Sequence, residues 1–356
     1  NYLGGIAGIN IGDNDKNRIY YEKTNTGSKK VAYTAGTIQQ CSTQSRKTIS
    51  GNSNLGGIVG WNLTEGILKK NTSYAGITAS GDYAGGVAGR NNGTIQIAHD
   101  GNDTVNRSIS AANGMAVGGI VGINEENGNI EATGTGNTNN EILAVGSGVT
   151  VTGEEKVGGI AGINRGQIGK STQMIYLTSQ AKRVRASKGM AGGVVGETYQ
   201  DITYAVNRAS SVTADSGTAG GITAVNHATI GNCKNYGNVS SSNGYAGGIA
   251  ANNKGTIKDS IVSGKAAGSG ITIHSIGQSE IGAVCAINSG TISGSYPEEK
   301  VTLQGDAGIF GGVTGTNSGT VKAVTLTQMP KIDASKSNLT VGGAVGANKG
   351  TVTQVK

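Results

Sequence analysis

Side chains able to act as nucleophiles, general acids or metal ligands are few in this chain of 356 residues, and they are spread thinly. The three histidines, His99, His227 and His274, do not form the His-Glu-x-x-His pattern with which metalloproteases hold zinc. The Gly-x-Ser-x-Gly motif of serine hydrolases does not occur either. We therefore expect no catalytic residues, no metal site and no cofactor.

Three pairs of adjacent glutamates are the only groupings that suggest acid–base chemistry. They are Glu125–Glu126, Glu154–Glu155 and Glu298–Glu299. Hydrolysis of a glycosidic bond needs two carboxylates that converge on that bond from opposite sides. Nothing in the spacing of these pairs indicates convergence, so we interpret them as solvated turn residues. A polysaccharide-degrading enzyme remains the alternative.

The three cysteines do not have the spacing of a zinc site or of a disulfide framework. Cys41 and Cys233 each follow a threonine by four residues, Thr37 and Thr229, whereas Cys285 stands at a small apolar position of a repeated phrase. We expect all three to be buried packing residues.

Any chemistry must be positioned by a repeat, which dominates the sequence. A phrase close to Gly-Gly-Ile-x-Gly-x-Asn-x-Gly-x-Ile occurs eleven times, with successive copies 27 or 28 residues apart where they are closest. Its glycine pairs stand at Gly4–Gly5, Gly56–Gly57, Gly85–Gly86, Gly118–Gly119, Gly158–Gly159, Gly192–Gly193, Gly220–Gly221, Gly247–Gly248, Gly311–Gly312 and Gly342–Gly343, with Gly282–Ala283 as a degenerate copy. One such unit cannot bury its own apolar face, so neighbouring units must stack.

The repeat predicts an all-β fold. Helix is disfavoured by 63 glycines, and the compact unit 220–246 holds three short apolar segments separated by turn residues. We expect one parallel β-solenoid domain over residues 1–356, right-handed, with about three short strands per rung and roughly 11 rungs. Loop insertions are expected near 11–35, 131–156 and 170–190.

Stacking the copies aligns two columns of side chains. The first is an inward stack of Ile and Val, such as Ile6, Ile58 and Val87. The second is asparagine, six residues after the first glycine in ten of the eleven copies; only Thr198 departs. Stacked amides can hydrogen-bond from rung to rung, and asparagine tolerates a left-handed corner. The ladder consists of Asn10, Asn62, Asn91, Asn124, Asn164, Asn226, Asn253, Asn288, Asn317 and Asn348.

The phrase, followed in residues 230–239 by Ile-Gly-Asn-Cys-Lys-Asn-Tyr-Gly-Asn-Val, resembles the GLUG repeat of bacterial surface proteins. The resemblance covers nearly the whole chain, although Ile commonly replaces the family's Leu and its Cys survives in only two copies. It implies an extracellular, surface-displayed protein without catalytic residues to transfer. Because GLUG repeats also accompany IgA-cleaving metalloproteases, a non-catalytic spacer of a larger surface protease is a further alternative.

Candidate binding residues combine tyrosine with basic side chains, a mixture suited to glycans and anionic polymers. We expect them in surface loops, because solenoid insertions often build the binding face. They are Tyr20, Tyr21, Lys29, Lys30, Tyr176, Lys182, Arg183, Arg185 and Lys188.

The leading hypothesis is a non-enzymatic structural or adhesive solenoid on the bacterial cell surface. The net charge of +7 is mild for this length, without the dense basic stripe that nucleic acid requires, and no apolar run is long enough to insert into a membrane. Expected partners are host or envelope glycans or proteins, and further copies of the chain by end-to-end stacking.

Overall fold

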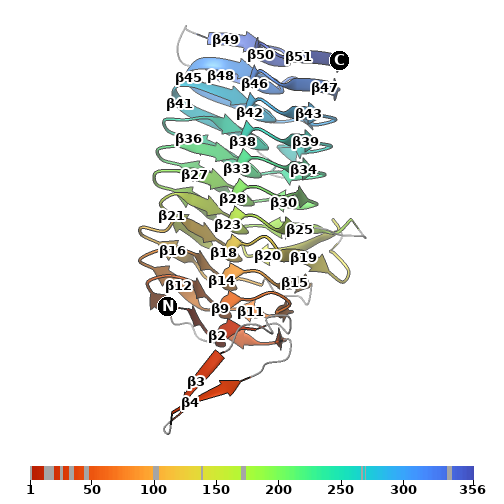
Figure 1. The fold of residues 1–356 in the computed structure, drawn as a ribbon. Helices are drawn as coiled ribbons and strands as arrows, with labels where there is room; N and C mark the ends of the chain where they lie inside the picture. The colour runs from red at the N-terminus through yellow and green to blue at the C-terminus, as the bar shows by residue number, and fades with distance from the viewer. Residues whose placement is uncertain are drawn as a thin grey trace.

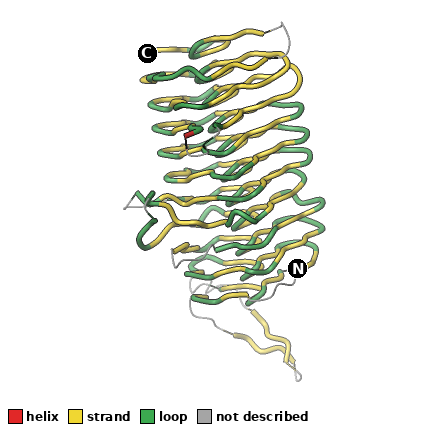
Figure 2. Tube along the Cα trace, turned by 180° about the vertical axis from the view of Figure 1, so that it is seen from behind, coloured by secondary structure: helices red, strands yellow, loops and turns green. Residues whose placement is uncertain are grey.

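The computed structural model describes residues 2–11, 20–24, 27–31, 36–43, 48–98, 104–137, 139–169, 174–265, 268, 270–334 and 339–356. In this part of the chain, short strands joined by turns wind into a rod, with the N-terminus near one end and the C-terminus at the other (Figures 1 and 2). Strands of successive turns pair in parallel throughout the rod. The predicted all-β, parallel solenoid is therefore confirmed.

The first of three long sheets receives two short segments from most turns. The segments before the bend are β7 (Thr48–Gly51), β12 (Gly76–Ala79), β16 (Ile109–Ala111), β21 (Thr150–Gly153), β26 (Arg183–Ala186), β31 (Ser211–Ala214), β36 (Asn238–Ser241) and β48 (Lys331–Ala334). Those after it are β1 (Leu3–Gly4), β8 (Leu55–Gly56), β13 (Ala84–Gly85), β17 (Ala116–Gly118), β22 (Lys156–Gly158), β27 (Met190–Gly192), β32 (Thr218–Gly220), β37 (Ala246–Gly247) and β49 (Leu339–Gly342). In β41 (Ile271–Gly282) and β45 (Val301–Gly311) the two segments are continuous.

The second sheet has eleven strands among the described residues, and each begins just after a glycine pair. They are β2 (Ala7–Asn10), β9 (Val59–Asn62), β14 (Ala88–Asn91), β18 (Val121–Asn124), β23 (Ala161–Asn164), β28 (Val195–Thr198), β33 (Thr223–Asn226), β38 (Ala250–Asn253), β42 (Cys285–Asn288), β46 (Thr314–Asn317) and β50 (Val345–Asn348).

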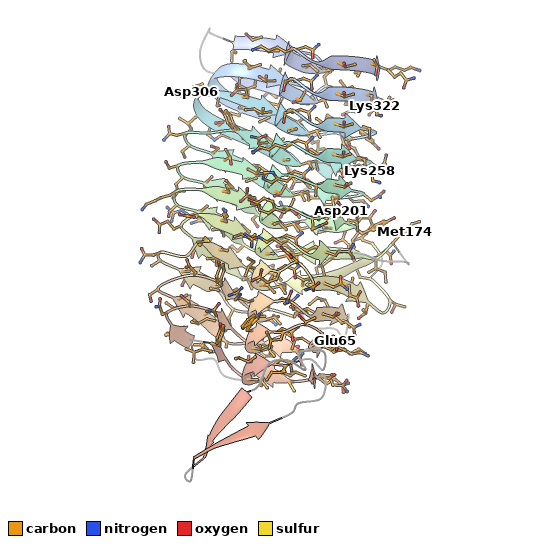
Figure 3. All side chains as sticks on the ribbon, viewed as in Figure 1. Glu65, Met174, Asp201, Lys258, Asp306 and Lys322 are labelled. Carbon is orange, nitrogen blue, oxygen red and sulfur yellow. The ribbon has the colours of Figure 1, made fainter. Side chains whose placement is uncertain are left out.

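The third sheet also has eleven described strands, and they lie at the end of the phrase, where several copies read Gly-Thr-Ile. They are β5 (Thr37–Gln39), β10 (Ile67–Lys69), β15 (Thr94–Ala98), β19 (Asn129–Thr133), β24 (Gln167–Ile168), β29 (Ile202–Thr203), β34 (Thr229–Gly231), β39 (Thr256–Lys258), β43 (Thr291–Ser293), β47 (Thr320–Val324) and β51 (Thr351–Val355). Asp201, Lys258 and Lys322 project outward along this side of the rod (Figure 3).

Shorter strands close the turn between the third sheet and the first. They are β6 (Ser42–Thr43) and β11 (Thr72–Ser73), and then the six-stranded row β20 (Glu141–Val145), β25 (Tyr176–Ser179), β30 (Ala205–Asn207), β35 (Lys234–Asn235), β40 (Ile261–Val262) and β44 (Tyr296–Pro297).

The paired glycines form aligned tiers, as the repeat predicts. Gly192 pairs with Gly220, Gly220 with Gly247 and Gly247 with Gly282. The steric reason is a sharp turn between the first and second sheets: a Cβ atom built on Gly220 would lie 1.8 Å from the carbonyl oxygen of Thr223. No side chain fits there, so glycine is required in every rung.

The interior is thin and aliphatic. Ile58, Val87, Ile120 and their equivalents up the rod are 0–1% exposed, which confirms the inward stack. At the first rung the same column is open, because no described rung lies beneath it, and Ile6 is 45% exposed.

The left-handed corner lies at a different place from the one expected. None of the ten ladder asparagines has a positive φ; they end extended strands of the second sheet. The corner instead follows the third sheet, where residues such as Gln40, Tyr204 and Asn232 have φ between 51° and 54°. The asparagines are therefore present for their amides, and not for their tolerance of this backbone conformation.

Two of the three predicted insertions contain rung strands as well as connecting turns. Residues 131–156 contain β20 and β21, with a stretch that is not strand before β20, and residues 170–190 contain β25 and β26; of the latter range, 170–173 lie outside the described residues. The first insertion leaves the rod: β3 (Tyr20–Thr24) and β4 (Gly27–Val31) pair antiparallel in a hairpin beyond the N-terminal rungs, and the described chain between β19 and β20 also projects from the side of the rod (Figure 1). In the described residues no helix has the length and apolar character needed to cross a bilayer.

Candidate functional site

The asparagine column is a continuous hydrogen-bonded ladder over most of the rod. Asn62 donates from Nδ2 to Oδ1 of Asn91 at 2.8 Å, and Asn91 donates in the same way to Asn124. The second amide hydrogen goes to a backbone carbonyl, as from Asn62 to Gly66. Most ladder residues are fully buried, so each amide satisfies polar groups that water does not reach.

The ladder is interrupted at Thr198. Its Oγ1 accepts a hydrogen bond from Asn164 at 3.0 Å but donates to the carbonyl of Gln200 at 2.6 Å, away from the next rung. Oδ1 of Asn226 is instead reached by the N–H of Ala228. The column therefore consists of two ladders, Asn10–Asn164 and Asn226–Asn348.

A cluster of charged side chains lies beside this interruption. Glu197, the neighbour of Thr198 in β28, is 6% exposed. Its Oε2 lies 2.8 Å from Nζ of Lys156, at the start of β22 one rung below, and its Oε1 lies 3.0 Å from Nε2 of His227, one rung above. Three consecutive rungs thus contribute to one ion-paired group, which we call the interruption cluster.

Aromatic stacking covers the interruption cluster. The ring of Tyr199 lies on the ring of His227, with centroids 4.5 Å apart and planes within 7°. The guanidinium of Arg165 lies 6.0 Å from the centroid of the Tyr199 ring. These three residues occupy the same turn position in successive rungs, directly after the asparagine column.

The electrostatics of the cluster favour the ionised form of Glu197. Burial alone would raise the pKa of Glu197, but the hydrogen bonds from Lys156 and His227 outweigh it and lower the pKa. Burial and the neighbouring Glu197 raise the pKa of Tyr199, so its phenol stays protonated. Chemically this is a carboxylate whose charge is satisfied by its neighbours.

Sequence reasoning missed this cluster, although one signal was visible. In the sixth copy the phrase reads Gly-Glu-Thr-Tyr-Gln-Asp-Ile in place of Gly-x-Asn-x-Gly-x-Ile, so two of its specified positions change together, to Thr198 and Gln200. Lys156 and His227 could not be assigned to the group until the register of β22, β28 and β33 was known.

A second group of interest is the outward side of the short row β25–β44, which we call the lateral face. At its start, Arg208 makes two hydrogen bonds to the buried Glu141, from Nε at 2.8 Å and from a terminal nitrogen at 2.7 Å. Thr178 donates to the same carboxylate at 3.2 Å. The hydrogen bond to Glu141 raises the pKa of Arg208, as expected for a paired guanidinium.

Tyrosines and cations pack against one another on the lateral face. The rings of Tyr176 and Tyr204 meet edge to face with centroids 5.7 Å apart. Nζ of Lys234 lies 4.2 Å from the centroid of the Tyr176 ring, and Arg208 lies 4.5 Å from that of Tyr236. These contacts hold the rings in fixed, half-buried positions.

The lateral face ends at a hollow of about 590 Å³. It lies above β44, where the tenth rung passes from β47 to β48 without adding a strand to the short row. The hollow is lined by Lys265, Tyr296, Glu298, Glu299, Thr325, Thr327 and Gln328. Nζ of Lys265 lies 3.6 Å from Oε1 of Glu299.

The structure does not bring the predicted binding residues together. Tyr20, Tyr21, Lys29 and Lys30 belong to the hairpin, in which Tyr21 pairs with Lys30; nothing is described of their side chains. Tyr176 is on the lateral face.

The basic run of the third predicted insertion is not a loop. Arg183 and Arg185 are outward residues of β26, between the buried Val184 and Ala186. Arg185 pairs with Asp215, and Lys188 with Glu154, on the first sheet's side of the rod. Lys182 directly precedes β26 and is exposed. These residues therefore lie on or beside the first sheet, whereas Tyr176 lies in the short row of strands.

The cysteines follow the prediction in two of three cases. Cys233 and Cys285 are fully buried, and burial raises the pKa of each thiol to about 12. Cys41 is only partly buried, since its rung lies near the open N-terminal end, so the expectation of burial is wrong there. His99 lies outside the described residues, and the described part of the chain contains no group of three metal-ligating side chains.

No protein-family model matches the chain, and neither a curated protein nor a solved structure was found to match it.

Proposed function

We propose that this chain is a non-enzymatic, stiff β-solenoid that serves a structural and adhesive role on the surface of a bacterium. The observation that carries the proposal is the uninterrupted register of the glycine tiers from Gly4 to Gly342, backed by two buried amide ladders. Stacked backbone and amide hydrogen bonds resist bending, which suits a part that holds a binding surface away from a cell. The resemblance to GLUG repeats supports the location.

The test measures shape and attachment together. Small-angle X-ray scattering of the purified chain should give an elongated particle of constant cross-section. Beads coated with it should be retained on mucin or on bacterial envelope preparations more strongly than beads coated with albumin. A compact particle, or retention no better than albumin, contradicts the proposal.

End-to-end stacking onto a second copy is part of the proposal. Strands β1 and β2 at one end, and β49, β50 and β51 at the other, each pair with a neighbour on one side only among the described strands. Apolar side chains are open there: Leu3 is 40% exposed and Val341 50%. Unpaired strand edges with exposed apolar residues favour association with further rungs of the same repeat. Sedimentation should show concentration-dependent growth that Val341→Glu combined with Val352→Glu abolishes.

Polysaccharide hydrolysis is the second candidate, because Glu298 and Glu299 line the hollow together with Tyr296. Release of reducing ends from neutral or acidic polysaccharides, lost in the Glu298→Gln and Glu299→Gln variants, would favour it. The same rod would also serve as a spacer in a larger surface protease, for which the tests of shape apply unchanged.

A further inference from the structure

We propose that the lateral face, from Tyr176 to the hollow at Tyr296, binds an uncharged polysaccharide chain laid along the axis of the rod. The proposal rests on the adhesive function above and names the surface and the ligand class that would carry it out.

The first argument is the rigidity of the rings. Tyr176 packs edge to face with Tyr204 and against Nζ of Lys234, and Tyr236 packs against Arg208, itself fixed by two hydrogen bonds to Glu141. A flat ring that is already immobile loses little entropy on binding, and tyrosine offers both apolar area and a hydroxyl. The C–H face of a pyranose ring is a natural partner for such a surface.

The second argument is the hollow. A volume of about 590 Å³ lies within the range of sites that hold small molecules. Its lining offers two carboxylates, two threonine hydroxyls and the amide of Gln328 beside the Tyr296 ring. Closely spaced donors and acceptors next to one aromatic ring match the hydroxyl-rich edge and apolar face of a sugar.

The third argument is charge. The cations of the lateral face and hollow, Arg208, Lys234 and Lys265, are matched in number by carboxylates. These are Glu141, Glu298 and Glu299. The region is therefore formally neutral, although the whole chain carries +7. An acidic polymer would be repelled by the glutamates of the hollow, and Arg208 and Lys265 are already paired with Glu141 and Glu299, so an uncharged chain fits better.

The fourth argument is length. Tyr176 and Tyr296 belong to β25 and β44, which are four rungs apart in the row β25-β30-β35-β40-β44. At about 4.8 Å per rung they are separated by roughly 19 Å along the axis. This distance accommodates several sugar units in line, with a tyrosine or the hollow available to more than one of them.

The experiment measures binding of the whole chain to immobilised β-glucan, α-mannan and polygalacturonate by biolayer interferometry. We expect binding to at least one of the two neutral polymers and weaker binding to polygalacturonate. The double variant Tyr236→Ala with Tyr296→Ala should bind at least ten-fold more weakly. The matched control is Tyr245→Ala, which removes a half-buried tyrosine next to β37, away from the lateral face. Circular dichroism establishes that each variant is folded.

A preference for polygalacturonate, absence of binding to both neutral polymers, or equal weakening by Tyr245→Ala would overturn the proposal. If a tyrosine variant fails to fold, Glu298→Gln with Gln328→Ala takes its place, because both side chains line the hollow from turns. Retention of variant-coated beads on mucin separates the two levels of the argument. Unchanged retention leaves the adhesive rod standing while the lateral face is refuted; loss of scattering consistent with a rod refutes both.

Discussion

The rung of residues 192–219 and the rung that begins at Gly247 share the glycine turn and the strand that follows it, but their buried side chains differ. Gly192 and Gly247 lie in the same column of stacked glycines, and β28 and β38 lie in the same sheet. In the later rung the side-chain amide of Asn253 donates a hydrogen bond to Asn288 of the next rung at 2.7 Å. In the earlier rung Thr198 makes no such bond, and a ladder ends there. The turn geometry is thus fixed by glycine, and the side-chain column can change where other polar partners are provided.

The largest effect should come from the feature that both rungs share. A Cβ atom on Gly192 would lie 1.7 Å from the carbonyl oxygen of Val195, and on Gly247 1.8 Å from that of Ala250. We expect Gly192→Ala and Gly247→Ala each to lower the free energy of unfolding by more than about 4 kcal/mol, as measured by urea unfolding. Gly148→Ala, which has no atom within 4 Å, is the control. If alanine were tolerated at Gly192 but not at Gly247, the turn that follows these glycines would have to differ between the two rungs.

The next largest effect on the free energy of unfolding should differ between the two rungs. Asn253 accepts from Asn226 and donates to Asn288 and to two backbone carbonyls. Asn253→Ala should therefore cost about 3 kcal/mol of unfolding free energy, because buried groups lose their partners. Thr198→Val, which removes only two hydrogen bonds, should cost about half as much. Equal losses in thermal or urea unfolding would mean that the ladder contributes nothing beyond its single bonds.

A pH series tests whether the interruption cluster replaces the ladder. Glu197→Gln should cost about 2 kcal/mol at pH 7, because it breaks a buried ion pair. Since the folded pKa of Glu197 is lowered, its contribution is complete above the unfolded value, about 4.3, and is lost as the pH falls through the folded value. The gap between wild type and variant should narrow below about pH 4.

Glu154→Gln is the control for that series, since its partner Lys188 is largely exposed. Its effect on unfolding free energy should stay under about 0.5 kcal/mol. A gap for Glu197→Gln that is constant from pH 7 to pH 3 would rule out the ionised carboxylate as the stabilising group.

The smallest expected effect is an increase in the free energy of unfolding. Thr198→Asn should restore the missing rung of the ladder, with Oδ1 accepting from Asn164 and Nδ2 donating toward Asn226. We expect the free energy of unfolding to rise by about 1 kcal/mol, one net hydrogen bond. A decrease would show that the interruption cluster and the ladder cannot coexist at this position.

The fold was predictable because the repeat specifies it many times over. Eleven copies of one phrase place Gly56 over Gly85 and Asn62 over Asn91 without any knowledge of the coordinates, and the structure confirms both pairs. The glycine two residues after the inward Ile or Val also has a steric reason: a Cβ atom on Gly60 would lie 2.6 Å from the backbone nitrogen of Leu3.

The errors have a common cause, which is variation in rung length. Between Gly118 and Gly158 the extra residues form a Gly- and Asn-rich connection between β19 and β20, while the residues on both sides of it are strand. At residues 183–186 the alternation Arg-Val-Arg-Ala is a strand pattern, with apolar side chains inward, and the density of positive charge obscured it.

The interruption cluster and the lateral face depend on contacts between rungs and were beyond prediction. Glu141 and Arg208 are 67 residues apart and meet only because β20, β25 and β30 stack in register. The spacing of two residues in the sequence does not predict such a pair when the rungs that separate the residues differ in length.

The amide ladders have a direction. Every hydrogen bond along them runs from Nδ2 of one rung to Oδ1 of the next rung in the chain, from Asn10 onward and again from Asn226 to Asn348. The column is therefore a line of parallel dipoles, with a carbonyl oxygen at its tail and an amide nitrogen at its head. A second copy can prolong it only head to tail, because two like ends would face each other with oxygen against oxygen or nitrogen against nitrogen. Fibres of this protein would then be polar, with two unlike tips, and closed symmetric pairs joined through their ends would be disfavoured.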